Sequence, residues 1–266
     1  MKTKFFLAVM LLALFTSCTS SDDGDSGGGN VSKNACPTLG LLTRVIDGTA
    51  CQELGSPVVK ITLEFSDGSS GLCSGTMISS DDVLTAAHCF FSDVTNAFVE
   101  VNSKRIAAHT IVMHPDVIAN EEALAVFNDV AVLQLSQATG FPTLPILGSR
   151  DIAQDDIVSI YGYGLDNSGG MGVLRSGQMK ISHVTDSHLF APFNGAGSNT
   201  CNGDSGGPAI FSFSDQEGIT TNAIVGIVSS GNDVNCQVGD TTLFSNVQST
   251  SISSFITTVV PDVTIK

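Results

Sequence analysis

Residues 203–213 read Gly-Asp-Ser-Gly-Gly-Pro-Ala-Ile-Phe-Ser-Phe, a tight turn walled by glycines and followed by a strand-like run. Glycines in such a turn let backbone N–H groups converge on one point beside Ser205, as the stabilisation of a developing oxyanion requires. The segment therefore predicts a serine nucleophile placed immediately before a β-strand. A plain glycine turn without chemistry is the alternative for these residues taken alone.

The same turn fits Gly-x-Ser-x-Gly, the nucleophile elbow of α/β hydrolases, but two features exclude that fold. An elbow leads into a helix, whereas Ala209–Phe213 is strand-like. An α/β hydrolase also needs its histidine after the serine. All five histidines of this chain precede Ser205, at positions 88, 109, 114, 183 and 188.

The chain on either side of this turn reads as many short strands separated by Gly, Asp, Asn or Ser clusters. Many short strands without intervening helices indicate an all-β fold, and about 220 residues of them favour two packed barrels. One helix is expected at Ser249–Val259. The expected strands are Val58–Phe65, Val83–Ala86, Phe98–Val101, Ile106–Val112, Val130–Leu135, Ile157–Tyr161, Gln178–Val184, Pro208–Phe213, Ile224–Ser229 and Thr242–Val247.

Composition and charge limit the possible functions. The chain has 266 residues, of which 42% are hydrophobic and 14% are charged, so a wholly disordered protein is excluded. With 11 Lys and Arg against 26 Asp and Glu, its net charge is −15. Such an acidic protein does not track nucleic-acid phosphates, and we expect no nucleic-acid partner. No Cys-x-x-Cys pair or other metal-binding cluster is evident, and we expect neither a metal nor a cofactor.

His88 and Asp129 are the candidate partners of Ser205. His88 follows an apolar strand and precedes Cys89, while the other histidines have no comparable setting. Asp129 opens an apolar strand, where its carboxylate would be partly buried and would need a partner such as a histidine N–H. A solvated histidine and an exposed loop aspartate are the alternatives for the two segments taken singly.

Together, Thr85-Ala86-Ala87-His88-Cys89, Asn128-Asp129-Val130-Ala131-Val132-Leu133 and Gly203-Asp204-Ser205-Gly206-Gly207-Pro208 resemble the signatures of chymotrypsin/trypsin-like serine proteases. The resemblance covers Val45 to about Val259, and the order His, Asp, Ser is the one that the family requires. It implies two packed six-stranded antiparallel β-barrels followed by a C-terminal helix. The first barrel is expected at about 45–142, the second at about 150–248, the helix at about 249–259 and a tail at 260–266.

The resemblance also implies a role for each residue in the hydrolysis of peptide bonds. His88 would take the proton of Ser205, Asp129 would orient the histidine, and Ser229 would bind Asp129. The N–H groups of Gly203 and Ser205 would form the oxyanion hole. A catalytically inactive surface binding protein on the same scaffold is the alternative.

Two further sites are implied by the resemblance. Arg44-Val45-Ile46-Asp47-Gly48 resembles the junction at which the precursors of this family are cleaved by another protease. The new ammonium group of Val45 would then pair with Asp204. The base of the specificity pocket would be Asn199, and its walls would be Gly231 and Thr242. With no carboxylate at the base, cleavage after uncharged residues is expected, unless Asp240 reaches the pocket.

The seven cysteines fit an exported protein. The resemblance implies the pairs Cys73–Cys89 and Cys201–Cys236. Cys51 matches a family cysteine whose partner is missing here, so Cys36–Cys51 is expected from the two thiols that remain besides Cys18. Such a bridge would span the cleaved bond and keep the propeptide attached until it is reduced.

The N-terminus reads as an export signal. Lys2 and Lys4 precede an apolar stretch of eleven residues, Phe5–Phe15, and the signal peptide is expected at 1–18. Leu14-Phe15-Thr16-Ser17-Cys18 resembles a bacterial lipobox, so Cys18 is the expected lipid anchor; ordinary cleavage near Ser17 is the alternative. Residues 19–44 form a flexible linker and propeptide. We therefore expect a monomeric surface lipoprotein, or a secreted one if Cys18 carries no lipid.

Overall fold

The computed structural model describes residues 32, 35–39, 50–51, 53–101, 104–214 and 217–266. Six strands form a closed antiparallel barrel in the order β1-β2-β3-β8-β5-β4. Their bounds are β1 Val58–Phe65, β2 Ser70–Met77, β3 Asp82–Thr85, β4 Val94–Val101, β5 Lys104–Met113 and β8 Ala131–Leu135. Inward-facing apolar residues such as Ile61, Val99 and Leu133 are fully buried in its core, as the two-residue period of a strand predicts.

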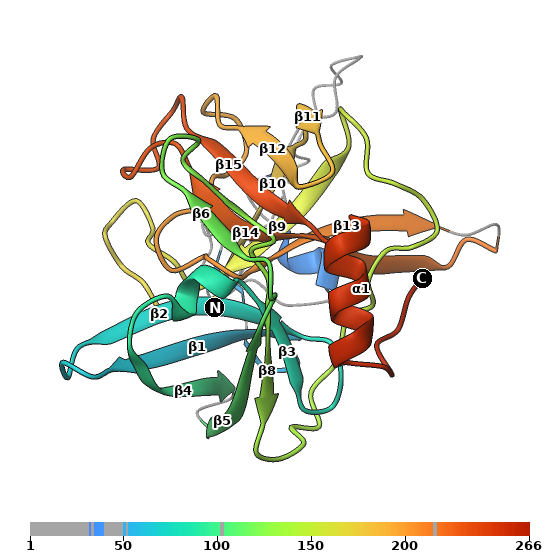
Figure 1. The fold of residues 1–266 in the computed structure, drawn as a ribbon. Helices are drawn as coiled ribbons and strands as arrows, with labels where there is room; N and C mark the ends of the chain where they lie inside the picture. Colours follow the sequence, from blue (N-terminus) through green and yellow to red (C-terminus); the bar gives the residue numbers. More distant parts are fainter. Residues whose placement is uncertain (1–31, 33–34, 40–49, 52, 102–103, 215–216) are drawn as a thin grey trace, which may run out of the picture.

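The second half of the chain forms a seven-stranded antiparallel sheet in the order β10-β9-β13-β14-β15-β12-β11. Its bounds are β9 Ile157–Gly162, β10 Arg175–Lys180, β11 His183–Val184, β12 His188–Pro192, β13 Pro208–Ser214, β14 Thr220–Gly231 and β15 Thr241–Asn246. The all-β, chymotrypsin-like fold is thus confirmed, although the second unit is a curled sheet of seven strands in place of the expected closed six-stranded barrel. Figure 1 shows the barrel, coloured from cyan to yellow-green, below this sheet, coloured from yellow to red.

Two smaller elements complete the fold. A separate hairpin pairs β6 (Ile118–Asn120) with β7 (Ala125–Phe127). The helix α1 (Thr250–Val259) begins after Ser249, whose side chain accepts a hydrogen bond from the N–H of Ile252. Buried residues of α1 share one core with the barrel, so the end of the chain is fixed to its first half. No helix in the described ranges is long and apolar enough to cross a membrane.

Candidate active site

His88 and Asp129 lie in contact where the barrel meets the second sheet. The Nδ1 atom of His88 lies 2.7 Å from Oδ2 of Asp129, and the backbone N–H of His88 donates to Oδ1 at 2.8 Å. Ser229, on β14 of the second sheet, donates its hydroxyl to Oδ2 at 2.6 Å. The side chain of Asp129 is fully buried. Because this carboxylate only accepts, it selects the His88 tautomer that carries its proton on Nδ1, which leaves Nε2 free to act as a base.

Local structure places both residues. His88 lies in the short 3-10 helix η2 (Ala87–Phe90) directly after β3, and the disulfide Cys73–Cys89 ties this helix to β2. Asn128 precedes Asp129 with a φ of 49°, a left-handed conformation that asparagine tolerates better than most residues. This turn delivers Asp129 to the start of β8, where Ser245 also donates to its carbonyl oxygen at 3.1 Å.

The Ser205 turn is bound to the same elements. The N–H of Ser74 on β2 donates to the carbonyl of Ser205 at 2.8 Å, and the N–H of Gly206 donates to the carbonyl of Val228 on β14 at 2.8 Å. Gly206 has a φ of +83°, and a Cβ atom added there would lie 2.9 Å from the N atom of Ala86. Only glycine, which has no Cβ atom, allows the backbone at position 206 to come this close to the backbone of Ala86. The turn therefore touches both the strand that leads to His88 and the strand that carries Ser229.

The expected oxyanion donors lie at the same turn. Gly203 has a φ of +96° and packs against the backbone of Gly164, and its carbonyl accepts from the hydroxyl of Ser74 at 2.8 Å. Within the described part of the chain, the N–H groups of Gly203 and Ser205 donate to no protein acceptor. Both donors thus remain free for a ligand oxygen.

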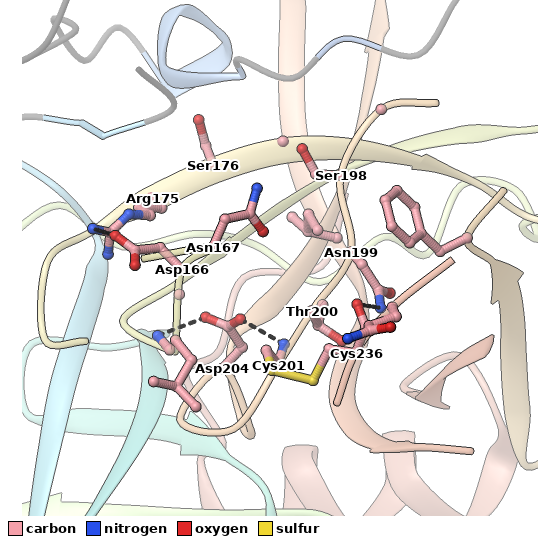
Figure 2. Close-up of a pocket in the computed structure, with 18 of the residues that line it drawn as sticks. Asp166, Asn167, Arg175, Ser176, Ser198, Asn199, Thr200, Cys201, Asp204 and Cys236 are labelled. Atoms are coloured by element: carbon pink, nitrogen blue, oxygen red, sulfur yellow. Dashed lines mark hydrogen bonds and ion pairs between the residues drawn. A yellow bond between two sulfur atoms is a disulfide. The ribbon is translucent and has the colours of Figure 1, made fainter. Parts of the chain in front are cut away.

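Asp204 lies behind the turn, at the edge of a cavity of about 730 Å³. Its carboxylate accepts from the N–H of Gly164 at 2.8 Å and of Cys201 at 2.9 Å (Figure 2). Burial raises the pKa of this carboxyl to about 6, and the nearby Arg175 opposes that rise. Arg175 pairs with Asp166 at the cavity wall (Figure 2). The cavity therefore offers a desolvated negative charge that lacks a direct cationic partner among the described residues.

The expected specificity residues form one hydrogen-bonded group. Nδ2 of Asn199 donates to the carbonyl of Cys236 at 3.1 Å and to Oδ2 of Asp240 at 2.8 Å, while its Oδ1 accepts from the Thr242 hydroxyl at 2.9 Å. Oδ1 of Asp240 accepts three backbone N–H groups at 2.8–2.9 Å, from residues 232, 233 and 241. A Cβ atom added at Gly231 would lie 3.1 Å from both Asp240 oxygens. Asp240 is therefore buried behind Gly231, and its carboxylate accepts four hydrogen bonds, one of them from Asn199.

A short segment at residues 35–39 packs against the second sheet. The structure contains the three disulfides expected from the sequence, Cys36–Cys51, Cys73–Cys89 and Cys201–Cys236. Cys36 begins the 3-10 helix η1 (Cys36–Leu39), and both Cys36 and Cys51 are fully buried. Ser176 Oγ on β10 lies 3.2 Å from each of these sulfur atoms and accepts from the N–H of Ala35 at 3.0 Å.

Further contacts fix this segment. The hydroxyl of Tyr161 donates to the carbonyl of Ala35, and Nδ2 of Asn222 donates to the carbonyl of Thr38 at 2.6 Å. The carbonyl of Ser32 accepts the N–H of Gln178 on the edge strand β10 at 2.8 Å. Residues 32 and 35–39 are thus an ordered part of the protease domain, whereas residues 19–44 were expected to form a flexible linker.

Several residues of these sites could not be predicted from the sequence. Ser176, Tyr161 and Asn222 carry no motif, and only the unmatched Cys51 signalled that its neighbourhood departs from the family pattern. Cys18, Arg44 and Val45 lie outside the described residues. The described residues include no group of three or more His, Cys, Asp or Glu side chains that could hold a metal ion.

Comparisons with known proteins identify the family and the fold of this chain. A family model described as Trypsin matches residues 45–256. Brachyurin of Leptuca pugilator is 29% identical over 197 residues, which are 66% of this chain and 82% of brachyurin. Trypsin 5G1 of Aedes aegypti is 25% identical over 255 residues, which are 85% of this chain and 88% of that protein. The solved structure of HL collagenase has a TM-score of 0.66 and 20% identity, covering 82% of this chain and 99% of its own, and so has the same fold.

Proposed function

The chain belongs to the trypsin family of serine proteases, and we propose that it is a serine endopeptidase whose catalytic triad is His88, Asp129 and Ser205. The observation that carries the proposal is the buried Asp129 carboxylate, which holds Nδ1 of His88 at 2.7 Å and the Ser229 hydroxyl at 2.6 Å. The contacts of the Ser205 turn with the same two elements support it.

In each half-reaction one proton moves onto Nε2 of His88 and off it again, first from Ser205 to the leaving amine and then from water back to Ser205. Ser205 Oγ attacks the scissile carbonyl while Nε2 of His88 accepts its proton, and the same proton then passes to the leaving amine. Water attacks the resulting acyl-enzyme with His88 again as the base. Asp129 holds the Nδ1 proton and stabilises the imidazolium. The N–H groups of Gly203 and Ser205 donate to the oxyanion, and one such donor contributes ~2.7–4 kcal/mol to lowering the barrier.

The enzyme is made as a precursor that is activated by cleavage after Arg44. The freed ammonium group of Val45 enters the cavity and pairs with Asp204, next to the nucleophile. The length of chain between Val45 and the cavity supports this step. Ala50 forms an isolated β-bridge with Arg175, and Arg175 lines the cavity. The five residues before Ala50 reach about 16–18 Å when extended. An ammonium group there would offset the cost of the buried Asp204 charge.

Substrate preference is the first test of the proposal. The base of the pocket is the neutral amide of Asn199, which is bound to Cys236, Asp240 and Thr242. The Asp240 carboxylate lies behind this amide and already accepts four hydrogen bonds, so a cation in the pocket would meet no carboxylate directly. We expect the cleaved protein to hydrolyse a peptide library after uncharged, small to medium residues, at least about tenfold faster in kcat/KM than after Lys or Arg, since an unpaired buried charge costs several kcal/mol. A preference for Lys or Arg would contradict this assignment, and no cleavage at all would contradict the peptidase.

One corollary concerns activation. An enzyme with this pocket cuts poorly after its own Arg44, so a separate protease of trypsin-like specificity must activate it. Prolonged incubation of the purified precursor alone should therefore yield little processed chain, whereas a trace of trypsin should process it rapidly.

The protease remains attached to its propeptide after activation. Cys36 lies before the cleaved bond and Cys51 after it, so their disulfide joins the two products. The family relation agrees with export from the cell, and a lipid on Cys18 would then hold the active enzyme at the cell surface.

Burial of the Cys36–Cys51 bridge changes the result expected from reduction. Both cysteines are fully buried, so a mild reductant should not reach the disulfide and should leave the fragment 45–266 with the membranes. Cys36→Ser should release that fragment after cleavage, because a segment this short holds few contacts without the covalent bond. Cys18→Ser, which removes only the anchor, is the matched control. Active enzyme found free in the medium of cells with the unaltered chain would contradict the tether.

A further inference from the structure

The buried hydroxyl of Ser74 has no part in the proposed proton transfers, yet it contacts the turn that carries the oxyanion donors. Ser74 lies on β2 and is fully buried. Its Oγ donates to the carbonyl of Gly203 at 2.8 Å and accepts from the N–H of Tyr163 at 3.0 Å. Tyr163 comes directly after β9, so one side chain of the barrel joins the second sheet to the Ser205 turn.

The two contacts fix the direction of the hydroxyl. A backbone N–H only donates, so the Ser74 oxygen accepts from Tyr163. A carbonyl only accepts, so the Ser74 proton points to Gly203. Tyr163 is 2% exposed and Gly203 is also buried, so removal of the hydroxyl would leave both backbone groups without a partner.

This bridge has a consequence because Gly203 lacks a side chain that would restrict its backbone. Gly203 has a φ of +96°. The peptide group before it carries the oxyanion donor N–H, and the carbonyl of that peptide group, from Asn202, accepts from the N–H of Leu165 at 2.9 Å. The peptide group after it is held through its own carbonyl by the Ser74 hydroxyl. The two hydrogen bonds therefore fix Gly203 from both sides, and the second is made by a side chain.

The backbone of Ser74 contacts the turn at a second point. Its N–H donates to the carbonyl of Ser205 at 2.8 Å, and its own carbonyl accepts from the Thr85 hydroxyl on β3 at 2.8 Å. Ser74 thus holds the peptide groups that directly follow both donor residues. A change of its side chain leaves these backbone bonds in place, so it isolates the effect on Gly203.

We infer that Ser74 is a positioning residue, whose hydroxyl holds the N–H of Gly203 at the place where the oxyanion forms. The inference rests on the proposed peptidase function and deepens it. A negatively charged oxygen depends on this donor far more than the uncharged carbonyl of the bound substrate does, because charge strengthens the hydrogen bond. Ser74 therefore acts on the transition state and has little effect on substrate binding.

Two variants of the cleaved enzyme test the inference. Ser74→Ala removes one oxygen atom and keeps the backbone bonds of β2. Thr76→Val, two residues along the same strand, is the matched control, because Thr76 is 1% exposed and its hydroxyl has no hydrogen-bond partner among the described residues.

Both variants are cleaved with trypsin and assayed on a peptide amide, whose slow chemistry makes KM a measure of substrate binding. The same peptide is also made as a trifluoromethyl ketone. Ser205 Oγ adds to the ketone carbon, its proton moves to His88, and the carbonyl oxygen becomes an oxyanion. The inhibition constant of this ketone therefore measures how well the oxyanion is bound.

Ser74→Ala should lower kcat about tenfold to thirtyfold, less than the ~10²–10³-fold that loss of a whole donor costs, because the N–H of Gly203 is displaced and not removed. KM should change less than about twofold, and the inhibition constant of the ketone should rise by the factor by which kcat/KM falls. Thr76→Val should leave all three values within about twofold of wild type. A fall in kcat/KM that comes mainly from KM, or wild-type kcat in Ser74→Ala, would overturn the inference.

Amide hydrogen exchange in the cleaved protein supplies a readout that does not depend on activity. The N–H groups of Asp204, Gly206 and Gly207 are hydrogen-bonded within the turn or to β14. Ser74→Ala should speed exchange at these three positions while the barrel strands keep their protection, and unchanged exchange would overturn the inference. Wild-type protein that neither cleaves the amide nor binds the ketone would refute the proposed function separately.

Discussion

Asp129→Asn is expected to lower kcat by about 10⁴-fold while the fold is retained, the size of effect known for this substitution in the family's triad. The physical reason lies in the hydrogen bonds of the carboxylate. Its Oδ1 accepts from the backbone N–H of His88, and its Oδ2 accepts from Nδ1. An asparagine that keeps the first bond turns its NH₂ group toward Nδ1, which forces the imidazole proton onto Nε2. That tautomer cannot accept the proton of Ser205.

The measurement is kcat on a peptide substrate at pH 8, after activation of both proteins in the same way. Ser229→Ala is the control, because it removes one donor to Asp129 but leaves the tautomer of His88 unchanged. Its loss should be much smaller than that of Asp129→Asn. Equal activity of Asp129→Asn and wild type would show that this carboxylate does not orient a catalytic base.

Arg44→Gln is expected to leave a precursor about 10²–10³-fold less active than the cleaved enzyme, the range that follows from an incomplete oxyanion hole. Without a cut after residue 44, no ammonium group enters the cavity beside Asp204. The carboxyl, whose pKa burial raises to about 6, then keeps an unpaired charge at pH 8 next to the Ser205 turn.

Ester hydrolysis before and after treatment with trypsin measures this effect. Arg105→Gln, at an exposed arginine of β5, is the matched control and should be activated like the wild type. Asp204→Asn should remain poorly active even after cleavage, because the ammonium group would have no charged partner. Full ester hydrolysis by intact Arg44→Gln would contradict the activation step.

Much of the fold was predictable because its strands follow simple patterns. Val58–Phe65 has β-branched residues and a closing turn, and β1 has the same bounds. The helix after Ser249 was equally predictable, because serine is a favourable N-cap residue and Pro261 marks the end of the helix. β2 was missed because Ser-Gly-Leu-Cys-Ser-Gly-Thr-Met is poor in strand formers. Its conformation is fixed by pairing with β1 and β3, which no local pattern records.

Some contacts of the candidate site could be predicted from the sequence, and others could not. The need of a buried Asp129 for a histidine partner could be argued from its apolar neighbours, and the structure places His88 there. The contacts of Ser176 with the Cys36–Cys51 bridge and of His188 with Val126 join residues more than 60 positions apart. Such contacts depend on how the two sheets pack and on side-chain direction. Neither leaves a periodic signal in the sequence.

Covalent labelling with a fluorophosphonate tests the central claim most directly, because this reagent reacts with a serine only where a base and an oxyanion hole activate it. The full chain is cleaved after Arg44, treated with the probe and digested, and the modified residue is located by mass spectrometry. The proposed function predicts stoichiometric modification of Ser205 in the cleaved protein, modification about 10²–10³-fold slower in the uncut precursor, and none in Ser205→Ala. Cleaved wild-type protein that stays unlabelled at Ser205 would contradict the enzyme and favour a binding protein on a protease scaffold.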